Sequence, residues 1–560
     1  MDDTSPSSSP TPPPRSALRG FAIAATCTAA MVVNNANNTS VAIALPSIGM
    51  DLRAHATTLQ WLVSAYALSS GCLLVFFGHI ADVHGRKRVF LGGSVVLAAF
   101  TLGCGFAQSQ NAMIVLRTLQ GVGGAATIPA AIGILAHNFP PSAGRAHAIA
   151  FASLAAGGPL GAALGMVLGG LLTQLTSDTW RAQFFLTAGL TVLTLVAGML
   201  FFPNDAPPSF SPTAAPPPHK TDWLGVFLST TGLVLLVFSL GQGADGSWDW
   251  PPPDIIALLA LSIVLLGMFA LWEMYLSRPR SSRTKNSFLA WAEAPPLLPP
   301  ALFARGRGRV GAMYLVALLQ FGAFMTWAFW VQLYYQIYIG LTPVGTVVKL
   351  IPMFVTGILC NLLVAIIAGR IPTGWLLTAG TLTTTIAPLL FTLIIPSASY
   401  WAFGFPAAVC VVVGVDFLFS AGMMFVASSV EPGEQSVAGG MFQTMTQLGT
   451  SFGVTASTIV FNHVQQWDAN GGEGALKSYH AAMWTGVAFG GLAAIVAFVA
   501  FWGVRVQPPG PPPSVGPTPA HHENLVAESR SRSGDEGRDS DSRVAQALEK
   551  SKRRGDGEQV

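Results

Sequence analysis

Apolar residues occur in blocks of about twenty along most of the chain, separated by short polar or proline-rich stretches. A helix rises about 1.5 Å per residue, so a block of that length crosses the hydrocarbon core of a bilayer. The pattern predicts fourteen spanning helices, at residues 19–44, 58–79, 88–107, 112–136, 148–172, 183–202, 223–241, 254–276, 309–332, 343–368, 374–395, 401–427, 436–462 and 480–503. An even number of spans places both ends of the chain on one side of the membrane.

Two polar segments divide these spans into groups. Residues 203–221 are rich in proline and residues 277–308 are basic, and together they flank the seventh and eighth spans. Two bundles that rock against each other are the usual transporter solution, so we expect an accessory pair between two six-helix bundles. The expected order is a disordered N-terminus, a six-helix bundle, a linker with the accessory pair and a basic loop, a second six-helix bundle and a disordered tail, at residues 1–17, 18–202, 203–308, 309–503 and 504–560.

Composition and charge agree with a membrane protein. The 560 residues are 51% hydrophobic and 10% charged, whereas a soluble chain carries about 25% charged residues. The loops predicted to share a side with the termini hold most of the basic residues, at positions 86, 87, 88, 145, 220, 278, 280, 283, 285, 305, 307, 309 and 370, whereas the opposite loops hold Arg53, Arg181 and Lys477. The positive-inside rule therefore predicts cytoplasmic termini, and we expect the plasma membrane as location.

Several function classes find no support in the sequence. The net charge of +3 is scattered over loops and the tail, so we expect no nucleic-acid partner. The sequence contains no P-loop or His/Glu metal spacing, and the five cysteines have no pairable spacing. We therefore expect a monomeric protein without enzyme activity, cofactor or metal, whose partners are a small solute, the lipid bilayer and protons.

The loop between the second and third spans carries an ordered motif. It reads Gly78-His-Ile-Ala-Asp82-Val-His-Gly85-Arg86-Lys87-Arg88. This pattern resembles the signature loop of the major facilitator superfamily. The resemblance implies that Gly78, Asp82, Gly85, Arg86 and Lys87 act as a latch between the bundles during conformational switching. A basic stop loop of any membrane protein is the alternative.

The fourth span contains a permanent cation. Arg117 lies several residues inside the apolar block, three residues before Gln120, and a buried charge is costly unless it is paired or faces a wet cavity. The segment looks like the second motif of the same superfamily, and the resemblance links its arginine with proton coupling. The alternative is that Arg117 snorkels to the membrane surface.

The fifth span contains a proline within a row of glycines, including Gly158, Pro159, Gly161 and Gly165. Proline bends a helix, and glycines at every fourth position leave a flat face for a neighbouring helix. The row resembles the motif of the drug-proton antiporters, which the resemblance associates with export. Helix packing alone is the alternative explanation.

Shorter matches follow in the order typical of the fourteen-helix drug-proton antiporter family, fungal members in particular. They start at Gln60-Trp61-Leu62, Trp180-Arg181, Asp222-Trp223-Leu-Gly225, Tyr335-Gln336 and Glu434-Gln435-Ser436. Of the polar residues in or near these matches, Gln336 and Gln443 are expected to line the solute path with Gln120. The resemblance implies the major facilitator fold and proton-coupled efflux of small organic compounds.

The first span departs from that family. Where the family commonly has an aspartate, this chain has asparagines, including Asn34, Asn37 and Asn38. An amide cannot take up and release a proton near neutral pH. The asparagines are therefore expected to line the solute path, or to form hydrogen bonds between helices.

Asp416 lies near the middle of the twelfth span, and Lys349 lies in the tenth. An intramembrane acid must face a cavity or a partner, and we expect Lys349 or Arg117 as that partner. Asp416 is then a proton or cation site, or half of a structural ion pair. Five aromatic residues near the end of the ninth span, Trp327, Trp330, Tyr334, Tyr335 and Tyr338, are expected to form an interfacial belt, or to stack on solute.

Three functions therefore remain open. The leading one is proton-coupled export of drugs, toxins or secondary metabolites. A second is transport of a small polar or inorganic solute, because fungal members that handle aminotriazole, borate or ammonium look similar around residues 60–92. A third is a non-transporting sensor on the same fold.

Overall fold

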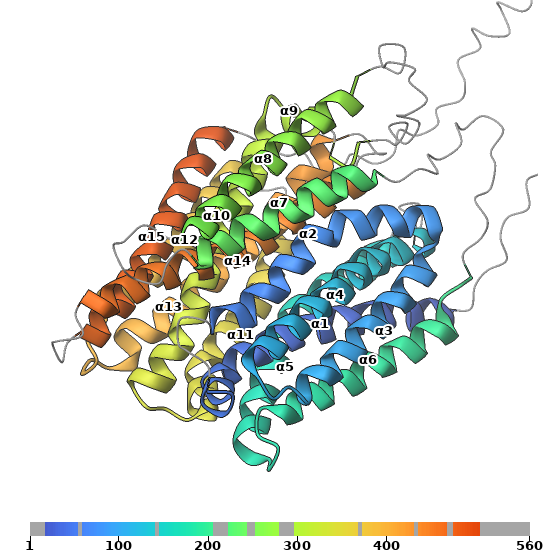
Figure 1. Cartoon of the computed structure of the whole chain (residues 1–560). Coiled ribbons are helices and arrows are strands. Elements are labelled where there is room, and N and C mark those ends of the chain that lie inside the picture. Colours follow the sequence, from blue (N-terminus) through green and yellow to red (C-terminus); the bar gives the residue numbers. More distant parts are fainter. Residues whose placement is uncertain are drawn as a thin grey trace, which may run out of the picture. The chain divides into compact units, whose positions relative to one another are not determined.

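The computed structural model describes residues 17–53, 59–139, 145–204, 222–242, 252–278, 296–298, 300–367, 372–430, 435–467 and 474–503. All of these residues lie in one compact unit that extends to Val506. They form helices and connecting turns, without a strand in the described part (Figure 1). The predicted disordered ends fall outside the described residues, apart from Ala17 at the start of the first helix.

The helices follow the predicted spans closely. Their bounds are α1 Ala17–Asp51, α2 Gln60–His84, α3 Arg86–Gly105, α4 Gln110–Asn138, α5 Arg145–Leu175, α6 Arg181–Phe201, α7 Trp223–Gln242, α8 Pro253–Leu276, the short α9 Pro300–Ala304, α10 Arg309–Leu333, the π-helical η5 Tyr334–Tyr338, α11 Pro343–Ile367, α12 Thr373–Thr392, α13 Tyr400–Ser429, α14 Gln435–Trp467 and α15 Gly474–Phe501. Each of the fourteen predicted ranges overlaps one long helix.

Twelve of the described helices are long and apolar enough to cross a membrane. The remaining two long helices are α1 and α14, which carry many Asn, Gln, Ser and Thr residues. The prediction of a polytopic all-α protein is therefore confirmed. Fourteen spans stay a prediction, because these two helices are too polar to be counted from composition.

Local sequence sets several helix ends. Gly85 has φ 106° between α2 and α3, a value that residues with a Cβ rarely adopt, so the chain turns there without a longer loop. Ser109 caps α4 by accepting a hydrogen bond from the amide of Ala112 at 3.3 Å. Pro252 precedes α8 and Pro253 occupies its first turn, where no amide donor is needed.

The long helices pack mainly within two groups. Helices α1–α6, which we call the N-terminal bundle, pack through pairs such as α1 with α5 and α2 with α4. Helices α10–α15, the C-terminal bundle, pack through pairs such as α12 with α13 and α10 with α14. The bundles meet where α2 contacts α14 and where α5 contacts α11, and α7 packs on both α2 and α14 with α8 beside it (Figure 1).

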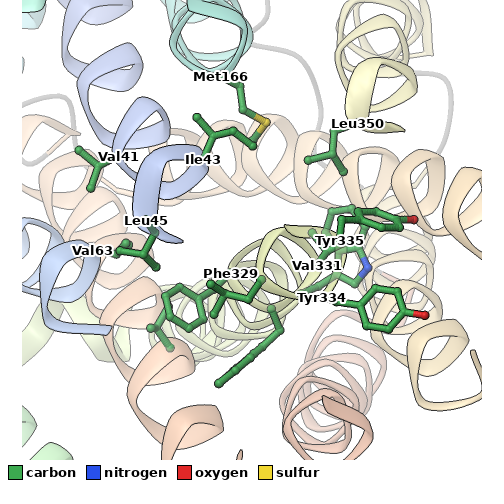
Figure 2. Close-up of a cluster of buried hydrophobic side chains, with 14 of the residues drawn as sticks. Val41, Ile43, Leu45, Val63, Met166, Phe329, Val331, Tyr334, Tyr335 and Leu350 are labelled. Atoms are coloured by element: carbon green, nitrogen blue, oxygen red, sulfur yellow. The ribbon is translucent and has the colours of Figure 1, made fainter. Parts of the chain in front are cut away.

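Two faces of the molecule can be distinguished by the helix ends that they carry. We call them the Asp51 face, at the end of α1, and the Arg86 face, at the start of α3. At the Asp51 face, one buried core joins residues of both bundles. Figure 2 shows Ile43 of α1 beside Met166 of α5, and Tyr335 of η5 with Leu350 of α11 in another part of the same core.

At the Arg86 face the bundles have separate cores. One contains residues of the N-terminal bundle, such as Phe90 and Leu135. The other contains residues of the C-terminal bundle with α9, such as Met313 and Phe442. The two bundles therefore share one hydrophobic core at the Asp51 face and have separate cores at the Arg86 face.

Candidate functional site

The Arg117 side chain lies in the interior of the N-terminal bundle and is fully buried. Its Nε donates to the Leu62 carbonyl at 2.9 Å, its Nη1 to Gln120 Oε1 at 2.7 Å and its Nη2 to Asn38 Oδ1 at 3.2 Å. Its guanidinium carbon lies 4.7 Å from the centre of the Tyr66 ring. These contacts give three of the five N–H donors of the cation a neutral acceptor and place an aromatic face beside it.

No described carboxylate lies within ion-pair distance of Arg117. The alternative that Arg117 snorkels to the membrane surface is wrong, because its side chain has no exposed area. Keeping an unneutralised cation buried in a membrane protein costs about 3 kcal/mol or more before its hydrogen bonds are counted. A group held at that cost is a strong candidate for function.

The asparagines of α1 belong to the same polar network. Asn34 is buried, accepts a hydrogen bond from the Tyr66 hydroxyl and donates to Thr127 Oγ1 at 3.2 Å. Asn37 is buried and its Nδ2 lies 3.5 Å from Thr101 Oγ1, which also accepts from Gln120 at 2.7 Å. The structure thus brings the three asparagines, Gln120 and Arg117 together. Asn34 and Asn37 form hydrogen bonds between helices, which was the alternative to a place on the solute path. Asn38 is half-buried beside the cation.

Asp416 lies on α13 and is half-buried. A side chain placed at Gly357 of α11 would lie 3.6 Å from Asp416 Oδ2, so the acid faces α11. Among the described residues, no ion pair joins Asp416 to Lys349 or Arg117. The predicted pairing is therefore wrong, because Arg117 is enclosed by α1, α2 and α4 and Lys349 is engaged elsewhere.

Lys349 contacts a tyrosine at the Asp51 face. Its Nζ lies 4.3 Å from the centre of the Tyr400 ring, and the Tyr400 hydroxyl donates to the Lys349 carbonyl at 2.6 Å. Both contacts hold the start of α11 against the start of α13. The role of Lys349 in charge coupling stays a prediction.

The motif between α2 and α3 bonds to neighbouring helices of its own bundle. Arg86 Nη1 donates to the Gly133 carbonyl of α4 at 2.9 Å, and Lys87 Nζ donates to the Phe202 carbonyl after α6 at 2.8 Å. Gly78 makes ordinary contact with α4. Asp82 lies in the last turn of α2, but its side chain is outside the described part. The latch between bundles stays a prediction.

The glycine row of α5 packs against the backbone of α1. A Cβ at Gly161 or Gly165 would overlap the carbonyl of Val32 or Ala36, respectively. Pro159 lies within α5, and Gly158 has nothing within 4 Å of an added Cβ. Gly161 and Gly165 therefore show the close helix packing that was the alternative explanation of the glycine row.

Gln336 joins the two bundles at the Asp51 face. It lies in η5 and its Nε2 donates to the Ile43 carbonyl of α1 at 2.9 Å. A second bond joins the bundles there, from the Val344 amide to Gln174 Oε1 at 3.2 Å. Gln443 is half-buried on α14. Gln336 thus helps to hold the two bundles together at the Asp51 face, and the solute-path role of both glutamines stays a prediction.

The aromatic residues at the end of α10 form a packed cluster. Trp327, Trp330, Tyr334 and Tyr335 are between 1% and 7% exposed, whereas Tyr338 is 36% exposed. The prediction of an interfacial belt is therefore wrong for the first four. Their rings lie within contact of aromatic residues of α12, α14 and α15, so they close the interior of the C-terminal bundle.

A cleft at the Arg86 face lies where the bundles have separate cores. It is lined by Leu74, Val75, Gly78, His79, Pro129, Asp222, Pro296, Leu297, Val437 and Gly440. Beside it lies a second buried acid, Glu273 of α8, which is 2% exposed. Glu273 is not among the site residues predicted from the sequence, although an ionisable residue within the predicted span 254–276 is itself a signal.

Comparisons with known proteins agree with this architecture. The chain is 29% identical over 427 residues to the puromycin resistance protein pur8 of Streptomyces alboniger, covering 76% of this chain and 78% of that protein. It is 28% identical over 494 residues to the cephamycin export protein CmcT of Amycolatopsis lactamdurans, covering 87% and 94%. It is 25% identical over 450 residues to a low affinity ammonium transporter of Saccharomyces cerevisiae, covering 80% and 82%.

The fold is also found in a solved transporter. The crystal structure of the POT family transporter PepTSo aligns with a TM-score of 0.61 at 13% sequence identity, covering 86% of this chain and 99% of that one. The sequence pattern of the Major Facilitator Superfamily matches residues 27–241 and 212–454. The predicted fold is confirmed, and a match over well more than half of the chain establishes that this multi-pass membrane protein belongs to the Major Facilitator Superfamily of transporters.

Proposed function

We propose that the chain is a secondary active transporter that exports small organic compounds across the plasma membrane in exchange for protons. In this proposal both termini and the Arg86 face are cytoplasmic, in accord with the basic loops on that side. The solute passes between the N-terminal and C-terminal bundles, and the fourteen-helix drug-proton antiporters are the relevant branch of the superfamily.

The observation that carries the proposal is the unequal packing of the two faces. At the Asp51 face the bundles share one core, closed by bonds such as Gln336 to the Ile43 carbonyl. At the Arg86 face each bundle keeps its own core, and a cleft lies between α2, α4 and α14. Such a molecule can close one face and open the other by rocking its two bundles. The conformation described here would load solute from the cytoplasm.

The export direction and the solute class are supported by relatives. Two of the proteins compared above are named for puromycin resistance and for cephamycin export. An exporter that loads from the cytoplasm and uses the inward proton gradient fits those names. The Arg117 network is the proposed coupling element in the N-terminal bundle, and Asp416 is the proposed proton carrier in the C-terminal bundle.

The test is solute transport by the purified protein in vesicles with an imposed pH gradient. Wild-type protein should move an antibiotic panel against a gradient, and collapse of the pH difference should stop it. Asp416→Asn should abolish gradient-driven transport while leaving the protein folded. Arg117→Lys keeps the charge but loses the forked donors, so transport should fall about tenfold or more. Undiminished coupled transport by Asp416→Asn would eliminate the proton role.

A second candidate is transport of a small polar or inorganic solute. The asparagine network of α1 favours it, because Asn38 is half-buried beside Arg117 and presents polar groups instead of an apolar wall. The similarity to an ammonium transporter agrees with it. Saturable ammonium or borate flux, in vesicles that do not transport the antibiotic panel, would establish this candidate in place of drug export.

A further inference from the structure

Residues 296–298, between α8 and α10, border the cleft at the Arg86 face, and we call them the cleft segment. Pro296 and Leu297 line the cleft together with residues of α2 and α4 from the N-terminal bundle and of α14 from the C-terminal bundle. Helices α2 and α14 meet there, because a Cβ at Gly440 would lie 3.9 Å from Val75 Cγ2. The cleft segment therefore lies beside the seam between the two bundles.

The cleft segment is anchored at two points. Leu298 packs against the core of the C-terminal bundle, and Leu302 of α9, a few residues later, is 2% exposed in the same core. The Leu297 amide donates a hydrogen bond to Glu273 Oε1 at 3.2 Å. Glu273 lies near the end of α8, in the hairpin of α7 and α8 that we call the accessory hairpin. The segment is thus attached to the C-terminal bundle and to this hairpin.

The end of α8 gives Glu273 a fixed position. Trp272 Nε1 donates to Asp222 Oδ1 at 2.9 Å, and the same oxygen accepts from the Gly225 amide in the first turn of α7, also at 2.9 Å. The start of α7 therefore holds the end of α8. Glu273 itself is only 2% exposed, so little water can replace its bond to the cleft segment.

We propose that Glu273 is a positioning residue that holds the cleft segment between the bundles and so limits closure of the Arg86 face. That face closes when the cleft residues of α2 and α4 approach those of α14. Pro296 and Leu297 lie among these residues and must move aside first. The bond from the Leu297 amide to Glu273 opposes this movement.

The direction of the effect follows from this position. Loss of the bond frees the cleft segment, so the Arg86 face closes more readily and the Asp51 face opens more readily. A buried hydrogen bond to a carboxyl group changes such an equilibrium by roughly tenfold. The link to solute transport rests on the proposed function, whereas the place of the segment between the bundles does not.

Cysteine labelling at both faces tests the inference in the purified full-length protein in lipid nanodiscs. Val437→Cys reports on the cleft, and Val347→Cys reports on the shared core at the Asp51 face. With Glu273→Leu, labelling by an impermeant maleimide should become roughly tenfold slower at position 437 and faster at position 347. Protein without either cysteine gives the background of the native thiols.

The opposite signs at the two faces separate positioning from loss of structure, because a destabilised protein becomes more accessible at both. Equal rates with and without Glu273→Leu, or faster labelling at position 437, would overturn the inference. Leu297→Pro removes the donor of the same bond and leaves Glu273 in place. It should shift the two rates in the same directions, and unchanged rates would equally contradict the inference.

Two controls identify the hydrogen bond as the cause. Glu273→Gln keeps an oxygen that accepts from the Leu297 amide, so its labelling should equal that of the wild type. Labelling like that of Glu273→Leu would show that the bond is not responsible. Asp254→Leu replaces an exposed acid at the opposite end of the same helix and should change neither rate.

Transport by the wild type in vesicles separates this inference from the proposed function. If the labelling shifts as expected but the wild type moves no solute, the proposed function fails and the positioning role of Glu273 stands. If the wild type moves solute but the labelling does not shift, the positioning role fails and the proposed function stands.

Discussion

A single methyl group in α5 tests how closely the bundle helices are packed. Gly161→Ala would place a Cβ 2.8 Å from Val32 Cα and 2.9 Å from Asn35 Cβ, and in overlap with the Val32 carbonyl oxygen. The Val32 atoms belong to the α1 backbone and cannot rotate away. Gly158→Ala is the matched control on the same helix, because nothing lies within 4 Å of its Cβ.

The expected magnitude follows from two opposing terms. Replacing glycine by alanine in a helix stabilises it by about 1 kcal/mol, and this gain is common to both variants. Overpacking of a close contact costs about 1–3 kcal/mol, and only Gly161→Ala pays it. We therefore expect the two variants to differ by about 1–3 kcal/mol, which is roughly tenfold in the folding equilibrium for every 1.4 kcal/mol.

The assay is unfolding of the purified protein in mixed detergent micelles with an increasing fraction of denaturing detergent. Gly158→Ala should unfold at the same denaturant fraction as the wild type or a higher one, and Gly161→Ala at a lower one. The thiol of Cys27 in α1 is fully buried and provides a second readout through its rate of modification. Equal stability of the two variants would refute the tight contact between α1 and α5.

Two further outcomes can be checked at the Asp51 face. Gln336→Leu removes a hydrogen bond between the bundles worth about 0.5–1.5 kcal/mol, so labelling of a cysteine at Val347 by an impermeant maleimide should rise roughly 2- to 10-fold. Gln332→Leu is the control, because the side chain of Gln332 bonds within its own helix, and it should not raise the labelling. Equal labelling in both variants would contradict a role of Gln336 in holding the bundles together. The Arg181 guanidinium lowers the pKa of Asp51, which lies beyond the predicted span, so their pair stabilises the folded protein at neutral pH and loses this effect as the pH falls below about 4. Both groups are partly exposed, so Asp51→Asn should lower the free energy of unfolding at neutral pH by about 0.5 kcal/mol. If the difference in melting temperature between this variant and the wild type does not change with pH, the loss of stability does not come from the ion pair.

The positions of the helices were predictable because their signal is local. A single block of about twenty apolar residues is stable in lipid as a helix, because every backbone donor and acceptor must then be satisfied within the segment. The exposed apolar surface of α8, with Ile263 and Leu271 more than half exposed, shows the same rule at its extreme. The long helices can therefore be located from the sequence without any knowledge of their packing.

The partners of the polar side chains were not predictable in the same way. Whether Asp416 meets Lys349 depends on the rotation and tilt of α11 and α13, which no local pattern encodes. The aromatic residues at the end of α10 likewise suit a membrane interface or a core, because both environments accept a large ring with one polar atom. Packing against α12, α14 and α15 decides the question, and these helices are remote in sequence.

The buried ionisable groups restrict which residue can carry a proton. Arg117 is buried among neutral partners, and a guanidinium does not release its proton near neutral pH, so it can bias a proton site but cannot be one. Within the described spans, the carboxyl groups away from exposed helix ends are Asp416 and Glu273. Asp416 faces α11 inside the C-terminal bundle, whereas Glu273 lies on the accessory hairpin. A proton that drives transport must be tied to the moving bundles, so Asp416→Asn should uncouple transport, whereas Glu273→Gln should leave it coupled.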